Sequence, residues 1–191
     1  MIGALAAFVR ITDRINDVIG RGVAWLTLAM VLITFLVVLL RYGFSLGWVA
    51  LQESYVWLHG IVFMMGAGYT LLHGGHVRVD LVYATARPRF KAWVDLLGSI
   101  FPLLPVIVVV AVNAFPYVAF SWKWLEASRE AGGLQGVFLL KSVILVFCLL
   151  VGLQGLALAA RNVLILLGHD EYVLREEAHE PGFSRTTGPH E

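Results

Sequence analysis

Four long apolar stretches, separated by short polar connections, set the pattern of this chain. They run over about 23–40, 51–72, 93–120 and 139–160. A helix of about 20 apolar residues crosses the hydrocarbon core of a bilayer, and backbone groups in lipid must be hydrogen-bonded within their own segment. The sequence therefore predicts an all-α membrane protein with a domain of four transmembrane helices over 23–160. In the third stretch Pro102 and Pro105 predict a kink.

Polar positions outside these stretches predict two interfacial helices and a tail. Residues 1–22 carry apolar side chains every three to four positions, with Arg10, Asp13, Arg14 and Asp17 between them. This predicts an amphipathic helix on the membrane surface; a helical lead-in packed on the other helices is the alternative. The aromatic residues of 121–136 predict a short helix half-sunk in the interface. Residues 161–191 form a polar tail.

The distribution of basic residues predicts the orientation. Ten of the 14 Lys and Arg fall in the N-terminal segment, the connection after the second stretch, and the tail. Positive charge accumulates on the cytoplasmic side of membrane proteins. We therefore expect both termini to be cytoplasmic and residues 42–50 and 121–136 to lie on the opposite side.

The composition excludes several classes of protein. The chain is 59% hydrophobic and only 14% charged, whereas soluble domains are about 45–50% apolar and about 25% charged. A net charge of +1 gives no electrostatic support for nucleic-acid binding. The single cysteine, Cys148, excludes an internal disulfide, a Cys-x-x-Cys redox pair and a structural zinc site.

Glu53 is the most unusual residue, since it interrupts the apolar pattern at the start of the second stretch. A helix N-terminus favours a negative charge, and Arg41 ends the first stretch on the same side. We expect an Arg41–Glu53 ion pair that joins two helices. A contact with a partner subunit and a proton site are the functional alternatives.

Histidines offer a second kind of chemistry. His59 lies about two turns inside the second stretch, but a haem site would need an axial pair and no other apolar stretch contains a histidine. We therefore interpret His59 as a hydrogen-bonded histidine at a helix interface. His76, Arg78 and Asp80 alternate with apolar residues after a Gly-Gly turn; this cytoplasmic loop motif is either a helix stop with a local ion pair or a recognition surface.

Small residues predict close packing between helices. Gly66 and Gly68 form one small patch, and Gly155 with Ala159 forms a small-xxx-small pattern. The sequence contains no nucleophile with a base and no metal-ligand cluster, so we predict neither catalysis nor a cofactor in this chain.

These features together resemble the small permease (Q) subunit of tripartite ATP-independent periplasmic (TRAP) transporters over about residues 15–165. The residues that carry the resemblance are Arg41-Tyr42, Leu51-Gln52-Glu53, Gly66-Ala67-Gly68-Tyr69-Thr70, His76-Val77-Arg78-Val79-Asp80, Trp93-Val94-Asp95-Leu96-Leu97-Gly98, Ser121-Trp122, Glu126, Ser128, Gly132-Gly133-Leu134 and Lys141.

The resemblance implies a location, partners and a role. It places the chain in a bacterial inner membrane as a scaffold for a large permease (M), which would hold the sodium and substrate sites. A periplasmic binding protein (P) would deliver a small organic acid. Its docking would involve Lys123, Glu126, Arg129 and Glu130, and the permease would contact the third and fourth apolar stretches. The rival interpretations are a self-sufficient small channel or transporter and a haem or quinone anchor of a respiratory enzyme.

Overall fold

The computed structural model describes residues 2–75 and 87–168 of the chain. In order along the chain, the helices are α1 (Ile2–Gly43), α2 (Val49–Leu72), α4 (Pro88–Gly98), a π-helical turn η1 (Ser99–Leu103), α5 (Leu104–Lys123) and α6 (Val137–Leu166). Four of the helical segments are long and apolar enough to cross a membrane. The predicted all-α fold with four spanning helices is therefore confirmed.

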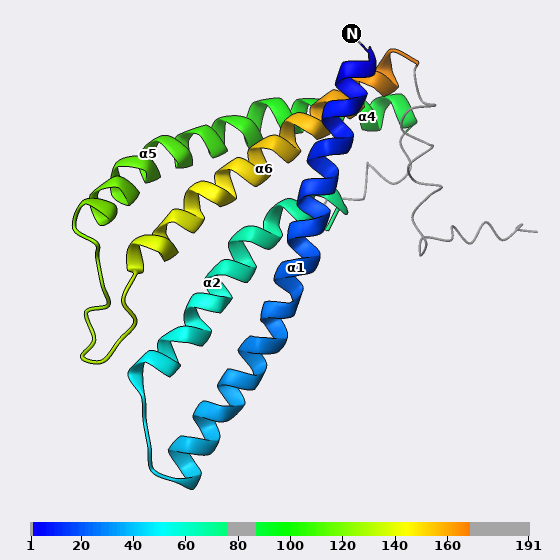
Figure 1. Ribbon diagram of the computed structural model, residues 1–191. Helices are drawn as coiled ribbons and strands as arrows, with labels where there is room; N and C mark the ends of the chain where they lie inside the picture. Colours follow the sequence, from blue (N-terminus) through cyan, green and yellow to red (C-terminus); the bar gives the residue numbers. More distant parts are fainter. Residues whose placement is uncertain (1, 76–86, 169–191) are drawn as a thin grey trace, which may run out of the picture.

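The long helices lie side by side in the order α1, α2, α6, α5 (Figure 1). α2 packs against both α1 and α6, α5 packs against α6, and α1 also meets α6 near the start of α1. We call the end that holds the connections 44–48 and 124–136 the loop end. The end that holds the start of α1 and the end of α6 is called the terminal end (Figure 1).

The first helix differs from the expected pair of a surface helix and a span. α1 runs without a break from Ile2 to Gly43, which corresponds to about 63 Å at about 1.5 Å per residue. Ala6, Val9 and Thr12 are buried in its first third, where α1 contacts α6. The N-terminal segment is thus a lead-in continuous with the span, because its apolar face has α6 to pack on.

The third span contains a π-helical turn at the place where Pro102 and Pro105 predict a kink. Between α4 and α5 the chain forms the π-helical turn η1, which includes Pro102, and Pro105 is the second residue of α5. Proline removes a backbone donor and interrupts the normal helical hydrogen bonds. Ser99 lies buried at this turn and donates its hydroxyl to the Asp95 carbonyl, 2.7 Å away.

The predicted short interfacial helix between the third and fourth spans is wrong. After α5 ends at Lys123, residues 124–136 form an irregular loop. Leu125, Gly132 and Gly136 all have positive φ, at 44°, 79° and 107°. Such backbone conformations cannot continue a right-handed helix. α6 also runs to Leu166, past the expected end of the span at residue 160.

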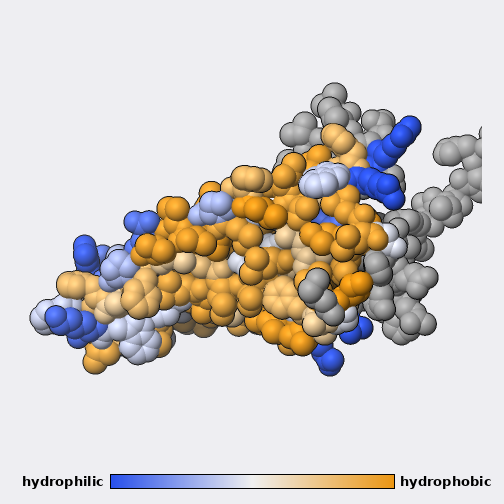
Figure 2. Space-filling model, turned by 90° about the horizontal axis from the view of Figure 1, so that it is seen from above, coloured by the Kyte–Doolittle hydropathy of each residue, from blue (hydrophilic) through white to orange (hydrophobic). Residues whose placement is uncertain are grey.

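Little of the helix layer is buried. The core cluster consists of Ile107, Cys148 and Val151, where α5 meets α6, with partly buried neighbours from α2. Figure 2 shows hydrophobic side chains over most of the visible surface, with the strongest hydrophilic colour toward the two ends. Exposed apolar side chains of this extent fit contact with lipid or with other membrane subunits.

Candidate functional sites at the two ends of the helix layer

At the loop end, Glu53 fastens the loop 124–136 to α2. Its carboxylate accepts a hydrogen bond from the Ser128 hydroxyl and another from the Leu134 backbone N–H, the latter at 2.6 Å. The Ser128 N–H donates in turn to the Leu134 carbonyl at 3.1 Å. A Cβ added to Gly133 would lie 2.8 Å from Glu53 Oε2. The loop therefore closes around the carboxylate, and glycine gives it the room to do so.

A second carboxylate, Glu126, ties the same loop to α5 and α6. It accepts hydrogen bonds from the Ser121 hydroxyl, at 2.7 Å, and from the Lys141 ammonium group. The Lys141 ammonium also lies 4.0 Å from the ring centroid of Tyr117. The hydrogen bond from Lys141, followed by that from Ser121, lowers the pKa of Glu126 below its ordinary value. Glu126 is thus a charged link within the chain.

These contacts differ from the expected ones in two ways. Among the ion pairs of residues 2–75 and 87–168, none joins Arg41 to Glu53, and Arg41 is exposed. The expected ion pair between two helices is therefore replaced by a contact between a helix and a loop. In this contact Glu53 accepts hydrogen bonds from Ser128 and Leu134. Glu126, one of the residues expected to dock a partner, also forms an ion pair with Lys141 of its own chain, and its docking role stays a prediction.

The other expected docking residues are exposed. Lys123 ends α5, with its ammonium group 5.7 Å from the ring centroid of Trp124. Arg129 and Glu130 lie on the surface of the loop, and the Glu130 backbone N–H donates to the Ser128 hydroxyl at 3.1 Å. A firmly held loop thus presents charges of both signs.

At the terminal end, a polar network joins α1 to α6. Asp13 forms an ion pair with Arg161 and accepts a hydrogen bond from Gln154 at 2.8 Å. Gln154 accepts one from the Asn16 amide, also at 2.8 Å. Asn16 and Gln154 are almost completely buried. The network satisfies polar groups that would be costly to bury alone.

The network continues into a close contact between α1 and α2. A Cβ on Gly68 would lie 2.1 Å from Asn16 Oδ1, and a Cβ on Gly20 would lie 2.3 Å from the Tyr69 ring. Asn16 Oδ1 is buried and accepts no hydrogen bond from a described residue. Asp17 lies 4.0 Å from the His73 imidazole, which gives a further polar contact between these helices.

Three of the four predicted packing residues lie in helix contacts. Gly68 faces Asn16, Gly155 would place a Cβ 2.8 Å from the Leu103 side chain, and Ala159 is buried. Gly66 differs, because nothing lies within 4 Å of where its Cβ would be. The surface next to Gly66 is therefore open.

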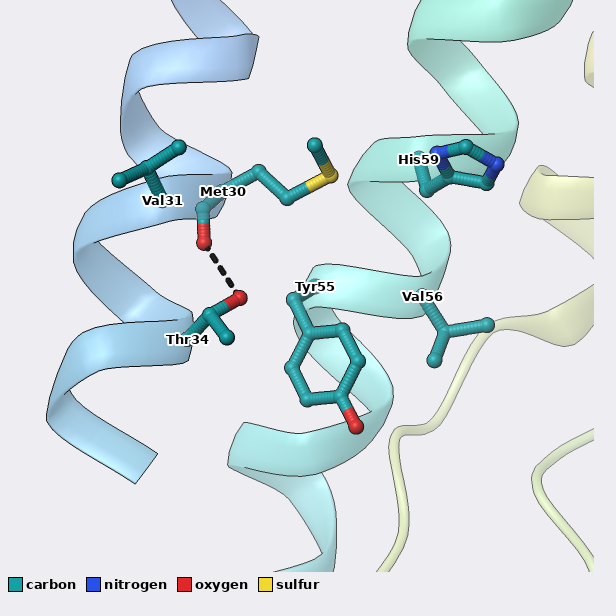
Figure 3. A pocket seen from close by; sticks show the side chains of 6 residues that line it. All are labelled: Met30, Val31, Thr34, Tyr55, Val56 and His59. Carbon is teal, nitrogen blue, oxygen red and sulfur yellow. Dashed lines mark hydrogen bonds between the residues drawn. The ribbon is translucent and has the colours of Figure 1, made fainter. Parts of the chain in front are cut away.

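A pocket of about 380 Å³ lies between α1 and α2, nearer the loop end. It is lined by Met30, Val31, Thr34, Tyr55, Val56 and His59. Figure 3 shows Met30 extending from α1 toward α2, while Val56 and His59 project from α2. His59 is exposed and makes no hydrogen bond with a described residue. The described residues therefore provide no partner for the hydrogen bond expected of His59, and its expected place at a helix interface stays a prediction.

Other predicted sites lie elsewhere. The motif of His76, Arg78 and Asp80 falls outside the described residues. Among the residues that the structure does describe, no group of three or more His, Cys, Asp or Glu is placed to hold a metal ion.

Comparison with known families decides what kind of protein has this geometry. Residues 30–165 match the family described as tripartite ATP-independent periplasmic transporters, DctQ component. The chain belongs to the DctQ family. Neither the curated proteins nor the solved structures gave a significant match.

The family agrees with the resemblance found in the sequence, and it defines the general role of this DctQ chain. It is a small multi-pass membrane component of a TRAP transporter, a family of transport components and not of enzymes.

Sequence reasoning missed the polar network of this DctQ component. In the sequence pattern Asp13 is a polar interruption of an amphipathic segment, and Arg161 is a basic residue at the start of a polar tail. One signal was available: Gln154 and Arg161 are seven residues apart, which places them on one face of a helix. Polar side chains on one face of an apolar helix are costly to bury without hydrogen-bond partners. Asp13 and Asn16 on α1 are these partners.

Proposed function

We propose that this DctQ chain is a scaffold subunit that transports nothing by itself. In this proposal a large permease (M) holds the sodium and substrate sites and carries out sodium-coupled uptake of a small organic acid. A periplasmic binding protein (P) delivers the substrate. The chain lies in a bacterial inner membrane with the terminal end cytoplasmic and the loop end periplasmic.

The separation of charges from the apolar middle of the helices carries this proposal. No Asp, Glu, Lys or Arg occurs in 22–40, 54–72, 96–122 or 142–160. Ion pathways through membranes are lined by several ionisable or other polar groups, whereas these stretches contain a single histidine, His59. A chain with charges only toward the ends of its spans fits a packing role better than conduction.

The contacts of Glu53 weigh against the channel alternative. A pore built from several copies would need Glu53 to face a shared lumen. Both oxygens of Glu53 instead accept hydrogen bonds from the loop of its own chain. The carboxylate is thus already used inside the chain.

The loop 124–136 is the surface that we propose for docking the binding protein. Glu53 and Glu126 fasten it at two points, so little conformational freedom remains to be lost when a partner binds. Lys123, Arg129 and Glu130 stay exposed on or beside it. Exposed charges of this kind guide the encounter between two proteins.

Co-purification and reconstitution test the scaffold. The chain, tagged at its C-terminus and extracted in mild detergent, should bring a large multi-span permease in equal amount. In liposomes the chain alone should give no uptake of organic acid, and the complex with binding protein should give sodium-dependent uptake. Ion conductance by the chain alone would contradict the scaffold role.

Alanine substitutions test the docking surface. Lys123→Ala with Arg129→Ala should raise the concentration of binding protein needed for half-maximal uptake. Arg14→Ala, which removes an exposed charge at the terminal end, is the matched control and should leave it unchanged. Unchanged uptake in the double variant would show that these two residues do not dock the partner.

A further inference from the structure

One face of α2 differs from the other exposed faces of the layer. Val56, His59, Phe63, Gly66 and Thr70 recur at alternating spacings of three and four, which places them along one side of the helix. Val56, His59, Phe63 and Thr70 are exposed, and Gly66 has open space at its Cβ position. We call these five residues the α2 seam.

His59 is the first reason to expect a protein partner on this seam. It lies six residues beyond Glu53, which puts it about 9 Å deeper along the helix. Acyl chains at that depth offer no hydrogen bonds, and a polar group left without a partner in hydrocarbon is costly. His59 makes no hydrogen bond with a described residue. Its partner is therefore expected on another molecule.

Thr34 and Asn113, two other exposed polar side chains in the spans, do not have this need. The Thr34 hydroxyl donates to the Met30 carbonyl at 2.8 Å, and the Asn113 amide donates to the Val109 carbonyl at 2.7 Å. Both are satisfied by their own helices. The imidazole of His59 makes no such bond to its own helix.

The shape of the seam is the second reason. Gly66 leaves a notch beside Phe63, and the pocket between α1 and α2 opens beside Val56 and His59. Small residues at such positions allow the backbone of another transmembrane helix to come close. A notch, a bulky side chain and a hydrogen-bonding group along one line favour a helix over disordered acyl chains.

The exposed face of α5 makes the contrast clear. Its exposed side chains include Val106, Val109, Val112 and Phe115, and a glycine is absent between Leu104 and Lys123. Such a face suits acyl chains, because flexible acyl chains can adapt to an apolar surface of any shape.

We propose that the α2 seam is the surface on which a transmembrane helix of the large permease packs, with a hydrogen-bonding side chain opposite His59. The proposal rests on the scaffold function and specifies its contact surface. It also moves the expected permease contact from the third and fourth spans to the second.

Photo-crosslinking in the assembled transporter tests the seam directly. Phe63 and Phe115 are similarly exposed, at 69% and 65%, on α2 and α5 respectively. Each would be replaced singly by p-benzoyl-phenylalanine and irradiated in native membranes. Crosslinking to the permease from position 63 but not from 115 is the expected result. A permease adduct from 115 alone, an adduct with a second copy of this chain, or lipid adducts alone at 63 would overturn the proposal.

A pair of glycine substitutions gives a second test. Gly66→Leu fills the notch, and Gly22→Leu on α1 is the matched control; a Cβ meets nothing within 4 Å at either position. Gly66→Leu should reduce the permease recovered per tagged chain about tenfold, because overpacking a helix contact has that order of effect. Gly22→Leu should leave recovery unchanged. His59→Leu should give a smaller loss, about threefold.

The outcomes separate the two proposals. If the unaltered chain brings no permease, the scaffold function fails. If it brings the permease and Gly66→Leu brings as much, the function stands and the seam is wrong.

Discussion

The loop end and the terminal end hold the chain together in different ways. At the loop end, Glu53 and Glu126 each bind a loop to helices, and the contacts lie near the surface. At the terminal end, Asp13, Asn16 and Gln154 join helix to helix through contacts that are mostly buried. One end fixes the shape of a surface, and the other fixes how the helices are arranged.

This difference follows from what each end has to satisfy. The loop 124–136 has backbone groups without helical partners, and carboxylates accept hydrogen bonds from such groups well. The terminal end has helices that approach closely at Gly20 and Gly68. There a polar network gives the helices a defined register. Damage at the terminal end should therefore unfold the layer, whereas damage at the loop end should alter only the loop.

The largest effect is expected from Asp13→Leu. Its side chain is 15% exposed and pairs with Arg161, so the substitution leaves a partly buried cation without its partner. Breaking such a pair costs about 3 kcal/mol. Reversible unfolding of the purified chain in detergent micelles, followed by circular dichroism, measures the loss.

The double variant Asp13→Leu with Arg161→Leu distinguishes the pair from simple loss of polarity. With both charges removed, at least half of the lost stability should return, because no unpaired charge remains. Additive losses in the double variant would show that the two side chains do not interact.

Gly68→Ala should be the next largest change. The new methyl group would lie about where Asn16 Oδ1 now sits, and overpacking of this kind costs about 1–3 kcal/mol. Gly66→Ala, two residues away on the same helix, is the control. It meets nothing within 4 Å and should stabilise the isolated chain slightly, since alanine favours helix over glycine. Equal unfolding curves for the two variants would refute the close α1–α2 contact.

These two glycines show how far the sequence could lead. The lengths of the apolar stretches predicted the four spans. The small residues Gly68 and Gly155 predicted contacts between helices. The same small-residue pattern could not separate Gly68 from Gly66, because that distinction depends on which way α1 packs. The pairing of Asp13 with Arg161 joins residues 148 apart, which no local pattern specifies. The helix predicted in the loop 124–136 is wrong because the aromatic residues do not determine its backbone, whereas Gly132 and Gly136 adopt positive φ.

Glu53→Gln should have a more local effect. The amide keeps the shape but loses the charge that holds Ser128 and the Leu134 N–H. Hydrogen exchange in 124–136 should become faster, with exchange in the middle of α6 unchanged. Glu130→Gln, an exposed carboxylate in the same loop, is the control and should leave exchange as it is. Faster exchange throughout α6 would mean that the two ends are not separable.

The smallest effect is expected from acid at Glu126. Its pKa is lower in the folded chain, chiefly through the hydrogen bond from Lys141. The stabilisation of the loop is therefore fully present above the pKa of the unfolded chain and is lost as the pH falls through the folded value. The rate of hydrogen exchange in the loop, corrected for the intrinsic pH dependence of amide exchange, should rise in that window.

Since Glu53 also contacts the loop, the informative quantity is the difference in exchange rate between the unaltered chain and Glu126→Gln. That difference should vanish at low pH and persist near neutrality. A difference independent of pH would show that the charge of Glu126 does not hold the loop.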